Sequence, residues 1–363
     1  MFTSIFHIKQ KIDIICVNCR AESGKYICKL FHKCYHTCRI TVTDIQIKLL
    51  LSITKPSKLI FAMKRAKTEE NCVKPEQSML LRFCTIFKLI KFSHTIFSFP
   101  FAVMSAFIAA GGMPEIRKLL LIIGALVMAR SCAMSFNRLV DAKYDIHNPR
   151  TAYRIQLQDM IGKTNLWFFT ISCTILFIVC AGMLNRLSLI ISPLALMVIF
   201  GYSYTKRFTN FSHIVLGLSL SLSPIGAWIG ITGRIDAAPF VLAFAVLLWT
   251  AGFDIIYACQ DLQHDIKTKL HSIPKMMGIK NSLILSSVLH FFVVITLFVF
   301  MYFTNLKYVY LGGVVFVGLM LIYEHTLIKP HDLSKINLAF FTVNGIISMI
   351  LMVTTIVDIS IFC

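Results

Sequence analysis

The sequence predicts an all-α protein that crosses a membrane many times. Hydrophobic residues make up 57% of the 363 residues and charged residues only 15%, whereas a soluble domain carries about 25% charged residues. The mean hydropathy of the chain is +0.75. Apolar runs of about 20 residues, the length that a helix needs to cross a bilayer, recur from residue 85 to the end of the chain. We therefore expect a bundle of transmembrane helices in a lipid bilayer.

Nine apolar segments are predicted to span the bilayer and to form one membrane domain, residues 79–363. Their expected bounds are 85–110, 118–138, 164–184, 187–205, 212–232, 237–258, 281–304, 308–328 and 336–357. Three glycines in the fifth segment are small enough to let neighbouring helices approach closely, and these are Gly217, Gly226 and Gly230. The predicted architecture is a polytopic nine-helix bundle.

The first 78 residues differ from the membrane domain. They hold six of the twelve cysteines, and their longest apolar run, 47–53, is too short to cross a bilayer. We interpret residues 1–78 as a basic extension that is either disordered or read from an early start codon, with Met63 and Met79 as later starts. The alternative is a zinc site formed by Cys16, Cys19, Cys34 and Cys38 with His32 and His36. We expect no signal peptide, because the first 20 residues lack a compact apolar core followed by a cleavage site.

The formal net charge of +19 would by itself suit a nucleic-acid partner. The basic residues lie mainly between the predicted spans, however, where they set the topology, so we expect no nucleic-acid partner. Thirteen lie in or next to the loops after the second, fourth, sixth and eighth spans, against five on the opposite side. The positive-inside rule then places the first group of loops in the cytoplasm.

Two acidic motifs lie at the ends of apolar segments on this cytoplasmic side. In the first motif, Asn137, Asp141 and Asp145 are spaced four residues apart, which places all three on one face of a helix. A single carboxylate at such a position is commonly a membrane-edge charge that caps a helix or fixes the topology. Two carboxylates at the end of a span are costly unless a cation lies between them.

The second motif repeats the spacing about 120 residues further along the chain. Tyr257, Asp261 and Asp265 again follow a long apolar run. Because both motifs are predicted to face the same compartment, we expect them to form one site. Mg²⁺ usually takes one or two carboxylates together with phosphate oxygens and water. The two motifs therefore predict a shared site for a divalent metal ion and a polyphosphate.

Several other polar residues are candidates for this site. Four cations on the same side are suited to holding phosphate groups, and these are Arg150, Arg154, Lys206 and Arg207. For Lys206 and Arg207, anchoring of the topology is an equally good interpretation. Asp254 lies one turn before Tyr257 and should face the bundle interior, either toward a substrate or toward a polar neighbour. His94 is interpreted as a packed residue near the membrane interface rather than a catalytic one.

These motifs resemble the UbiA family of intramembrane aromatic prenyltransferases, in which NxxxDxxxD is followed by a second DxxxD, often with a preceding Tyr. Further stretches similar to the family are NPRTAYR (148–154), GYSYTKRFT (201–209) and SPIGAWIGITG (223–233). The likeness covers about residues 82–363 and is greatest to bacterial members called 4-hydroxybenzoate polyprenyltransferases. One departure is the run IQLQDMIGK (155–163), because relatives usually continue there with a Pro and a Gly.

The resemblance implies an enzyme that transfers a polyprenyl group from polyprenyl diphosphate to an aromatic acid like 4-hydroxybenzoate, in quinone biosynthesis. It implies a site that faces the cytoplasm from the bacterial inner membrane, with Mg²⁺ and the diphosphate held by Asp141, Asp145, Asp261 and Asp265. The substrate-binding residues implied beside them are Asn137, Arg150, Arg154, Lys206, Arg207, Asp254 and Tyr257.

Several alternatives to this function stay open. Within the family, these are the same chemistry on a dihydroxynaphthoate acceptor for menaquinone, and a haem farnesyltransferase. Outside it, a divalent-cation transporter would place its carboxylates near mid-span, whereas these lie at one membrane face. A CDP-alcohol phosphotransferase also uses spaced aspartates, but its Asp-Gly and Ala-Arg lead is missing from the two motifs.

The predicted topology can be tested by labelling in cells. In a background without the native cysteines, single cysteines next to Lys143 and next to Lys267 should be protected from a membrane-impermeant thiol reagent in sealed cells. Both should react after permeabilisation. A cysteine beside Arg234, in a loop on the opposite side, is the control that should react in sealed cells. Labelling of either motif loop from outside would contradict a shared cytoplasmic site.

Overall fold

The computed structural model describes residues 85–90, 95 and 97–362. The predictions for residues 1–78 and for His94 lie outside these ranges. Within them the chain folds into helices without a β-sheet, as predicted. The elements are α6 Phe99–Ala110, α7 Ile116–Asp145, α8 Tyr153–Ile161, α9 Lys163–Leu184, α10 Arg186–Thr205, α11 Ser212–Thr232, α12 Ala238–Ala258, η2 Cys259–Asp261, α13 Leu262–Lys267, α14 Ile273–Thr304, α15 Tyr308–Leu327, η3 Leu338–Val343 and α16 Asn344–Phe362.

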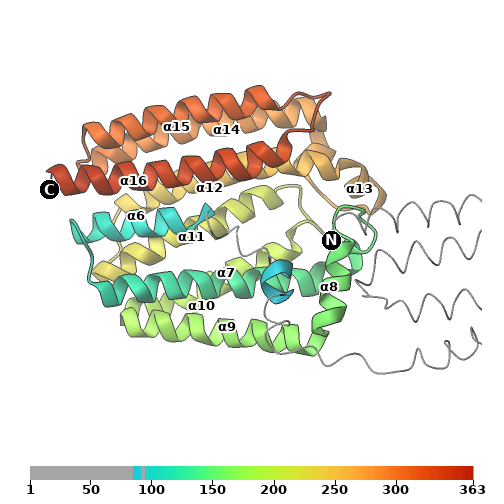
Figure 1. Ribbon diagram of the computed structural model, residues 1–363, viewed down its shortest axis with the longest axis horizontal. Helices are drawn as coiled ribbons and strands as arrows, with labels where there is room; N and C mark the ends of the chain where they lie inside the picture. The colour runs from blue at the N-terminus through green and yellow to red at the C-terminus, as the bar shows by residue number, and fades with distance from the viewer. Residues whose placement is uncertain (1–84, 91–94, 96, 363) are drawn as a thin grey trace, which may run out of the picture. The chain divides into compact units, whose positions relative to one another are not determined.

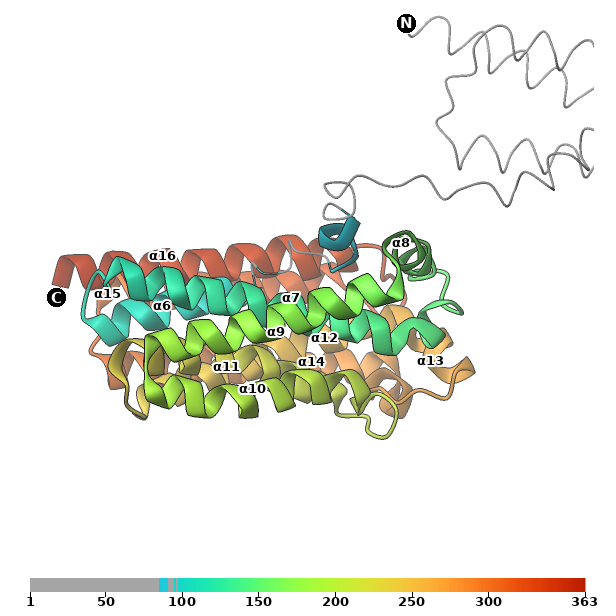
Figure 2. The same ribbon diagram turned by 90° about the horizontal axis from the view of Figure 1, so that it is seen from below.

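The long helices run side by side, and the short helices α8 and α13 lie at the same end of the bundle (Figures 1 and 2). Eight helices among the described residues are long and apolar enough to cross a membrane. Six of them are single helices, namely α7, α9, α10, α11, α14 and α15. The other two are composite, because α12 continues through η2 into α13, and η3 continues into α16. The chain is therefore a multi-pass membrane protein, and the predicted all-α bundle is confirmed.

The first predicted span, 85–110, is the one that differs from the prediction. Its described part is divided into a helical turn at 85–89 and the helix α6, which has only 12 residues. A helix of this length rises about 18 Å, less than the hydrocarbon thickness of about 30 Å. Pro100 favours the start of α6 at this point, because proline has no N–H to donate and fits the first turn of a helix. With α6 counted beside the eight long helices, the structure agrees approximately with the nine predicted spans.

α12 is the most deeply buried of the long helices. Within its apolar window 67% of the residues are buried, against 39% or less in the other seven. It packs against α11 on one side and α14 on the other. An aromatic cluster surrounds its second half, where the ring of Phe253 lies 4.9 Å from Trp249, 5.5 Å from Phe97 and 5.2 Å from Phe340, measured between centroids. The second acidic motif therefore begins at the end of a tightly packed helix.

The π-helical turn η3 lies beside this cluster and is held by buried hydrogen bonds. The Asn344 side chain accepts a hydrogen bond from Trp249 Nε1 at 2.7 Å and donates one to Glu324 Oε1 at 2.8 Å. The turn places the ring of Phe340 against that of Tyr257, with 4.2 Å between the centroids. Single π turns inside α-helices frequently occur at functional sites. Here the turn supports a residue of the second acidic motif.

Two of the three glycines singled out in α11 allow close packing, and one does not. A Cβ added at Gly217 would lie 2.5 Å from the carbonyl oxygen of Leu247 in α12, and one at Gly230 would lie 3.1 Å from Leu184 Cδ1. A Cβ at Gly226 would have no described atom within 4 Å outside its own helix, because Gly226 faces a cavity. The predicted packing role of Gly226 is therefore wrong.

The contact between α11 and α12 predicts that Gly217→Ala destabilises the bundle. The added methyl group would force the two backbones apart, and overpacking of this kind costs about 1–3 kcal/mol. We expect a lower midpoint of thermal unfolding in detergent. Gly226→Ala is the matched control on the same helix and should leave the midpoint close to that of the wild type. Equal midpoints for both variants would contradict the close approach at Gly217.

Candidate active site

The two acidic motifs meet at the end of the bundle where α8 and α13 lie (Figure 1). The first motif forms the last turns of α7, and the second begins in the last turn of α12 and continues through η2 into α13. A polar cavity of about 200 Å³ lies between them. All the predicted site residues line this cavity, namely Asn137, Asp141, Asp145, Arg150, Arg154, Lys206, Arg207, Asp254, Tyr257, Asp261 and Asp265.

In the first motif, each carboxylate lies near an arginine. Asn137 Nδ2 donates to Asp141 Oδ2 at 2.8 Å, and Arg207 Nη2 lies 3.8 Å from Asp141 Oδ1. Arg154 Nη1, from α8, lies 3.2 Å from Asp145 Oδ1 and 3.3 Å from Asp145 Oδ2. The three residues spaced by four thus share the helix face that turns toward the cavity.

Arg150 connects the two motifs. It lies in the loop between α7 and α8 and donates to both carboxylate oxygens of Asp261, from Nε at 3.0 Å and from Nη2. Its Nη1 donates to the Tyr257 hydroxyl at 2.8 Å. Asn148 Nδ2, from the same loop, adds a hydrogen bond of 3.1 Å to Asp261 Oδ1. Burial alone would lower the pKa of Arg150, but the hydrogen bond to Asp261 and the charge of that carboxylate raise the pKa above its usual value.

Asp265 is the least exposed of the four carboxylates, at 2%. Its Oδ2 makes no hydrogen bond with any part of the chain that the structure describes. Burial alone would lower the pKa of nearby Lys206, but the negative charge of Asp265 raises this pKa above its usual value, so Lys206 stays charged. Lys275 Nζ donates to the backbone carbonyls of Asp265 at 3.3 Å and Leu270 at 2.7 Å, which holds the loop after α13 in place.

The donor chemistry of the polar cavity fits Mg²⁺ held together with a diphosphate. A buried carboxylate oxygen without a partner, such as Asp265 Oδ2, is costly unless a cation approaches it. The described side chains do not gather three carboxylates, histidines or cysteines into a ready metal cage. Mg²⁺ needs no such cage, because it usually takes one or two carboxylates and completes its shell with substrate phosphate oxygens and water.

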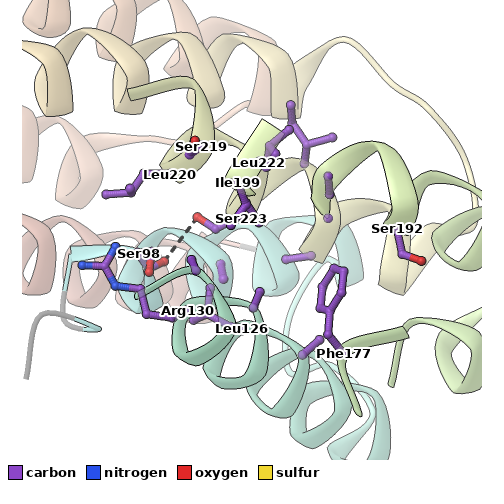
Figure 3. Close-up of a pocket in the computed structure, with 18 of the residues that line it drawn as sticks. Ser98, Leu126, Arg130, Phe177, Ser192, Ile199, Ser219, Leu220, Leu222 and Ser223 are labelled. Carbon is purple, nitrogen blue, oxygen red and sulfur yellow. Dashed lines mark hydrogen bonds between the residues drawn. The ribbon is translucent and has the colours of Figure 1, made fainter. Parts of the chain in front are cut away.

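Figure 3 shows a second, apolar cavity of about 180 Å³, which shares lining residues with the polar one. Helices α6, α7, α9, α10 and α11 line it, largely with alanine, leucine and isoleucine side chains. Six residues line both cavities, namely Arg130, Met134, Asn137, Tyr202, Leu216 and Leu220. The two cavities are therefore neighbouring parts of one space, which is polar at the acidic motifs and apolar further along the helices.

Arg130 is a cavity residue that the sequence analysis missed. It lies on α7 two turns before Asn137, and Figure 3 shows its side chain reaching toward Ser98. Its Nε is shielded from solvent and has no hydrogen-bond partner among the described residues. The signal was present in the sequence, because an arginine in the middle of an apolar span is by default a functional-site candidate.

Asp254 pairs with a histidine that the sequence did not reveal as its partner. Its Oδ2 lies 2.7 Å from Nδ1 of His213, which belongs to the first turn of α11. His213 is fully buried, whereas Asp254 lines the polar cavity. Asp254 therefore pairs with a polar neighbour, as one of the two interpretations has it, and also lines the polar cavity.

The described helices form a membrane bundle with a polar cavity at one end and an apolar cavity beside it. Residues 98–346 match the UbiA prenyltransferase family. The chain belongs to this family, which confirms the resemblance seen in its motifs, and it is a prenyltransferase.

Individual relatives support this assignment. The chain is 25% identical over 253 residues to a 4-hydroxybenzoate octaprenyltransferase of Francisella tularensis subsp. novicida, which covers 69% of this chain and 88% of the relative. The apo structure of a UbiA homolog from Aeropyrum pernix K1 is 27% identical, with a TM-score of 0.67 over 73% of this chain and 98% of that chain. A UbiA homolog from Archaeoglobus fulgidus, solved with DMAPP and Mg²⁺, shares the fold at 18% identity, with a TM-score of 0.60 over 77% of this chain and 100% of that chain.

The bridge between the two motifs predicts the effect of Arg150→Lys. A lysine keeps the charge but has a single nitrogen in place of the three guanidinium nitrogens that bond both oxygens of Asp261 and the Tyr257 hydroxyl. Hydrogen bonds to charged groups contribute about 1.5–3 kcal/mol, so kcat/KM for prenyl transfer should fall by roughly 10- to 100-fold. Arg234→Lys, in a loop at the other end of the bundle, should retain full activity. A fully active Arg150→Lys variant would show that the bridge is dispensable.

Proposed function

We propose that this protein transfers a polyprenyl chain from its diphosphate to an aromatic acid of the 4-hydroxybenzoate type, as a step in quinone biosynthesis. One observation carries the proposal. A cavity lined by five carboxylates and several cations adjoins an apolar cavity, and six residues line both. This pairing suits a substrate with a charged head and a long hydrocarbon tail. The name of the Francisella relative supports the acceptor class.

The diphosphate would lie in the polar cavity. Asp141, Asp145, Asp261 and Asp265 would hold Mg²⁺, which neutralises negative charge on the diphosphate as the carbon–oxygen bond breaks. The Archaeoglobus homolog was solved with a prenyl diphosphate and this metal ion. The four cations predicted from the sequence line the same space and would donate to phosphate oxygens, namely Arg150, Arg154, Lys206 and Arg207.

The prenyl chain would lie in the apolar cavity. Burial of each CH₂ group there stabilises the bound substrate by about 0.8 kcal/mol. Gly226 keeps one wall open, because no described atom outside its helix lies within 4 Å of the position of a Cβ. The aromatic rings of Phe253, Tyr257 and Phe340 line the polar cavity, where their faces can stabilise the positive charge that develops on the departing allylic carbon.

The carboxylate of the acceptor would bind Arg130. This arginine lies where the two cavities join, and its Nε has no partner among the described residues. A cation that lines an apolar wall is stabilised by an anion, and a guanidinium matches a carboxylate in shape. An aromatic acid bound here lies between the diphosphate and the apolar cavity. Its ring carbon attacks the allylic carbon, and a ring proton leaves.

The active-site end of the bundle would face the cytoplasm of a bacterium, in the inner membrane. Segments 138–163 and 262–280, which include α8 and α13, hold nine of the thirteen basic residues on which the positive-inside rule depends. Family membership favours transfer chemistry over the divalent-cation transporter that was considered from the sequence.

The proposal is tested with purified membranes, a labelled polyprenyl diphosphate and several aromatic acids. EDTA should abolish product formation, and Mg²⁺ should restore it. Asp141→Asn and Asp261→Asn should each reduce kcat by at least about 10²-fold, because the metal's stabilisation of the leaving diphosphate contributes several kcal/mol. The double variant should be little worse than either single one, since one assembled site is lost in each case.

Asp159→Asn is the matched control, because Asp159 is exposed on α8 and does not line the polar cavity. It should retain wild-type turnover. Full activity of either motif variant, or of the wild type in EDTA, would remove the metal–diphosphate mechanism. A product formed only with a dihydroxynaphthoate would agree with the proposed mechanism but would identify the acceptor as one of the menaquinone type.

A further inference from the structure

We propose that His213 positions Asp254 as the proton acceptor for the hydroxyl group of the aromatic acceptor. This inference rests on the proposed function, since it concerns how the same site activates its second substrate. His213 would touch neither substrate and would act only through Asp254. It is a positioning residue on α11, while Asp254 on α12 faces the cavity.

The geometry fixes one side of the Asp254 carboxylate. Its Oδ2 lies 2.7 Å from His213 Nδ1, and the His213 side chain is 0% exposed against 15% for that of Asp254. Among the described residues, no hydrogen bond reaches Oδ1 of Asp254, which leaves this oxygen for the cavity. A carboxylate held through one oxygen and accessible through the other has the arrangement that a general base requires.

The surroundings of His213 decide where its proton lies. Its Nε2 is buried and has no hydrogen-bond partner among the described residues. A proton on Nε2 would be buried without a partner, which is costly, so the ring proton is placed on Nδ1, where it donates to Asp254 Oδ2. This bond fixes the orientation of the Asp254 carboxylate.

Other charged groups near Asp254 come from α10 and α12. Tyr202 of α10 and Lys206 just after it interact electrostatically with Asp254, and Tyr257 lies one turn further along α12. His290 of α14 bonds instead to the Trp249 carbonyl, earlier on α12, at 3.3 Å. Of the described groups, His213 is therefore the one whose hydrogen bond sets the orientation of the Asp254 carboxylate.

The proton transfer balances without any further reactant. Asp254 Oδ1 takes the hydroxyl proton of the acceptor, and the released electron pair increases the electron density of the ring. The ring carbon then bonds to the allylic carbon as the carbon–oxygen bond breaks, and the electron pair of that bond leaves with the diphosphate. The ring carbon loses its proton to the diphosphate, and Asp254 returns the first proton to the acceptor oxygen. Asp254 is thereby restored as a carboxylate.

The test compares His213→Leu with His213→Asn, because the Asn Nδ2 can take the place of the histidine Nδ1 donor whereas Leu offers none. With 4-hydroxybenzoate, His213→Leu should lower kcat by about 10- to 100-fold, while KM for the prenyl diphosphate stays unchanged. His213→Asn should recover most of the loss. With ring-fluorinated 4-hydroxybenzoates, whose hydroxyl groups are more acidic, the loss in His213→Leu should shrink, because less help is needed to remove the proton.

A double variant and a control complete the experiment. His213→Leu combined with Asp254→Asn should be no slower than Asp254→Asn alone, because His213 acts through that carboxylate. Ser221→Ala is the control, since Ser221 is a buried polar residue of α11 that bonds only within its own helix and lines neither cavity.

Several results would overturn the inference. A wild-type kcat in His213→Leu, a loss equal for all acceptors, or a loss that Asn fails to recover would each contradict it. Independent, additive losses in the double variant would do the same. A wild-type enzyme that prenylates no aromatic hydroxy acid would refute the proposed function itself, and the role of His213 with it.

Discussion

Charge compensation inside an apolar bundle is the constraint on which this structure depends. The four carboxylates of the two acidic motifs line one cavity at the end of the bundle, where each negative charge raises the free energy of its neighbours. Three of them are compensated by arginines, in the pairs Asp141–Arg207, Asp145–Arg154 and Asp261–Arg150. The last pair has the widest effect, because Arg150 comes from the loop after α7 and binds a carboxylate in η2, directly after α12. Two motifs that are distant in sequence are thus held as one site.

The same pairs explain how the cavity could accept a diphosphate in the proposed reaction. Without substrate, the arginines satisfy the carboxylates, and Lys206 stays charged beside Asp265. A diphosphate that arrives with a divalent cation offers the carboxylates a new positive partner and the arginines a new negative one. In the proposed complex, each of these buried charges would therefore keep a partner of opposite sign.

The sequence predicted the helical architecture and the residues around the polar cavity, because both depend on local patterns. Apolar runs indicate spans, and aspartates spaced by four share a helix face wherever that helix lies. Contacts between helices are not local, so the bond between His213 and Asp254 could not be foreseen. Gly226 was misread for the same reason, since a glycine that faces a cavity has the same sequence signature as one that faces a neighbouring helix. Arg130 differs from His213 and Gly226, because its position within an apolar span identifies it as a candidate from the sequence alone.

The π turn at η3 makes the number of residues in this turn important for the shape of the polar cavity. A π turn contains one residue more than an α turn, so it corresponds to a single-residue insertion in a regular helix. Removal of one residue there would allow a regular α turn in its place, so the side chains of the turn would change direction while α16 kept its own orientation. Phe340 would then no longer face Tyr257, whereas Asn344 would keep its bonds to Trp249 and Glu324. In an alignment of relatives, a one-residue gap between positions 338 and 343 would therefore mark a differently shaped wall of the polar cavity.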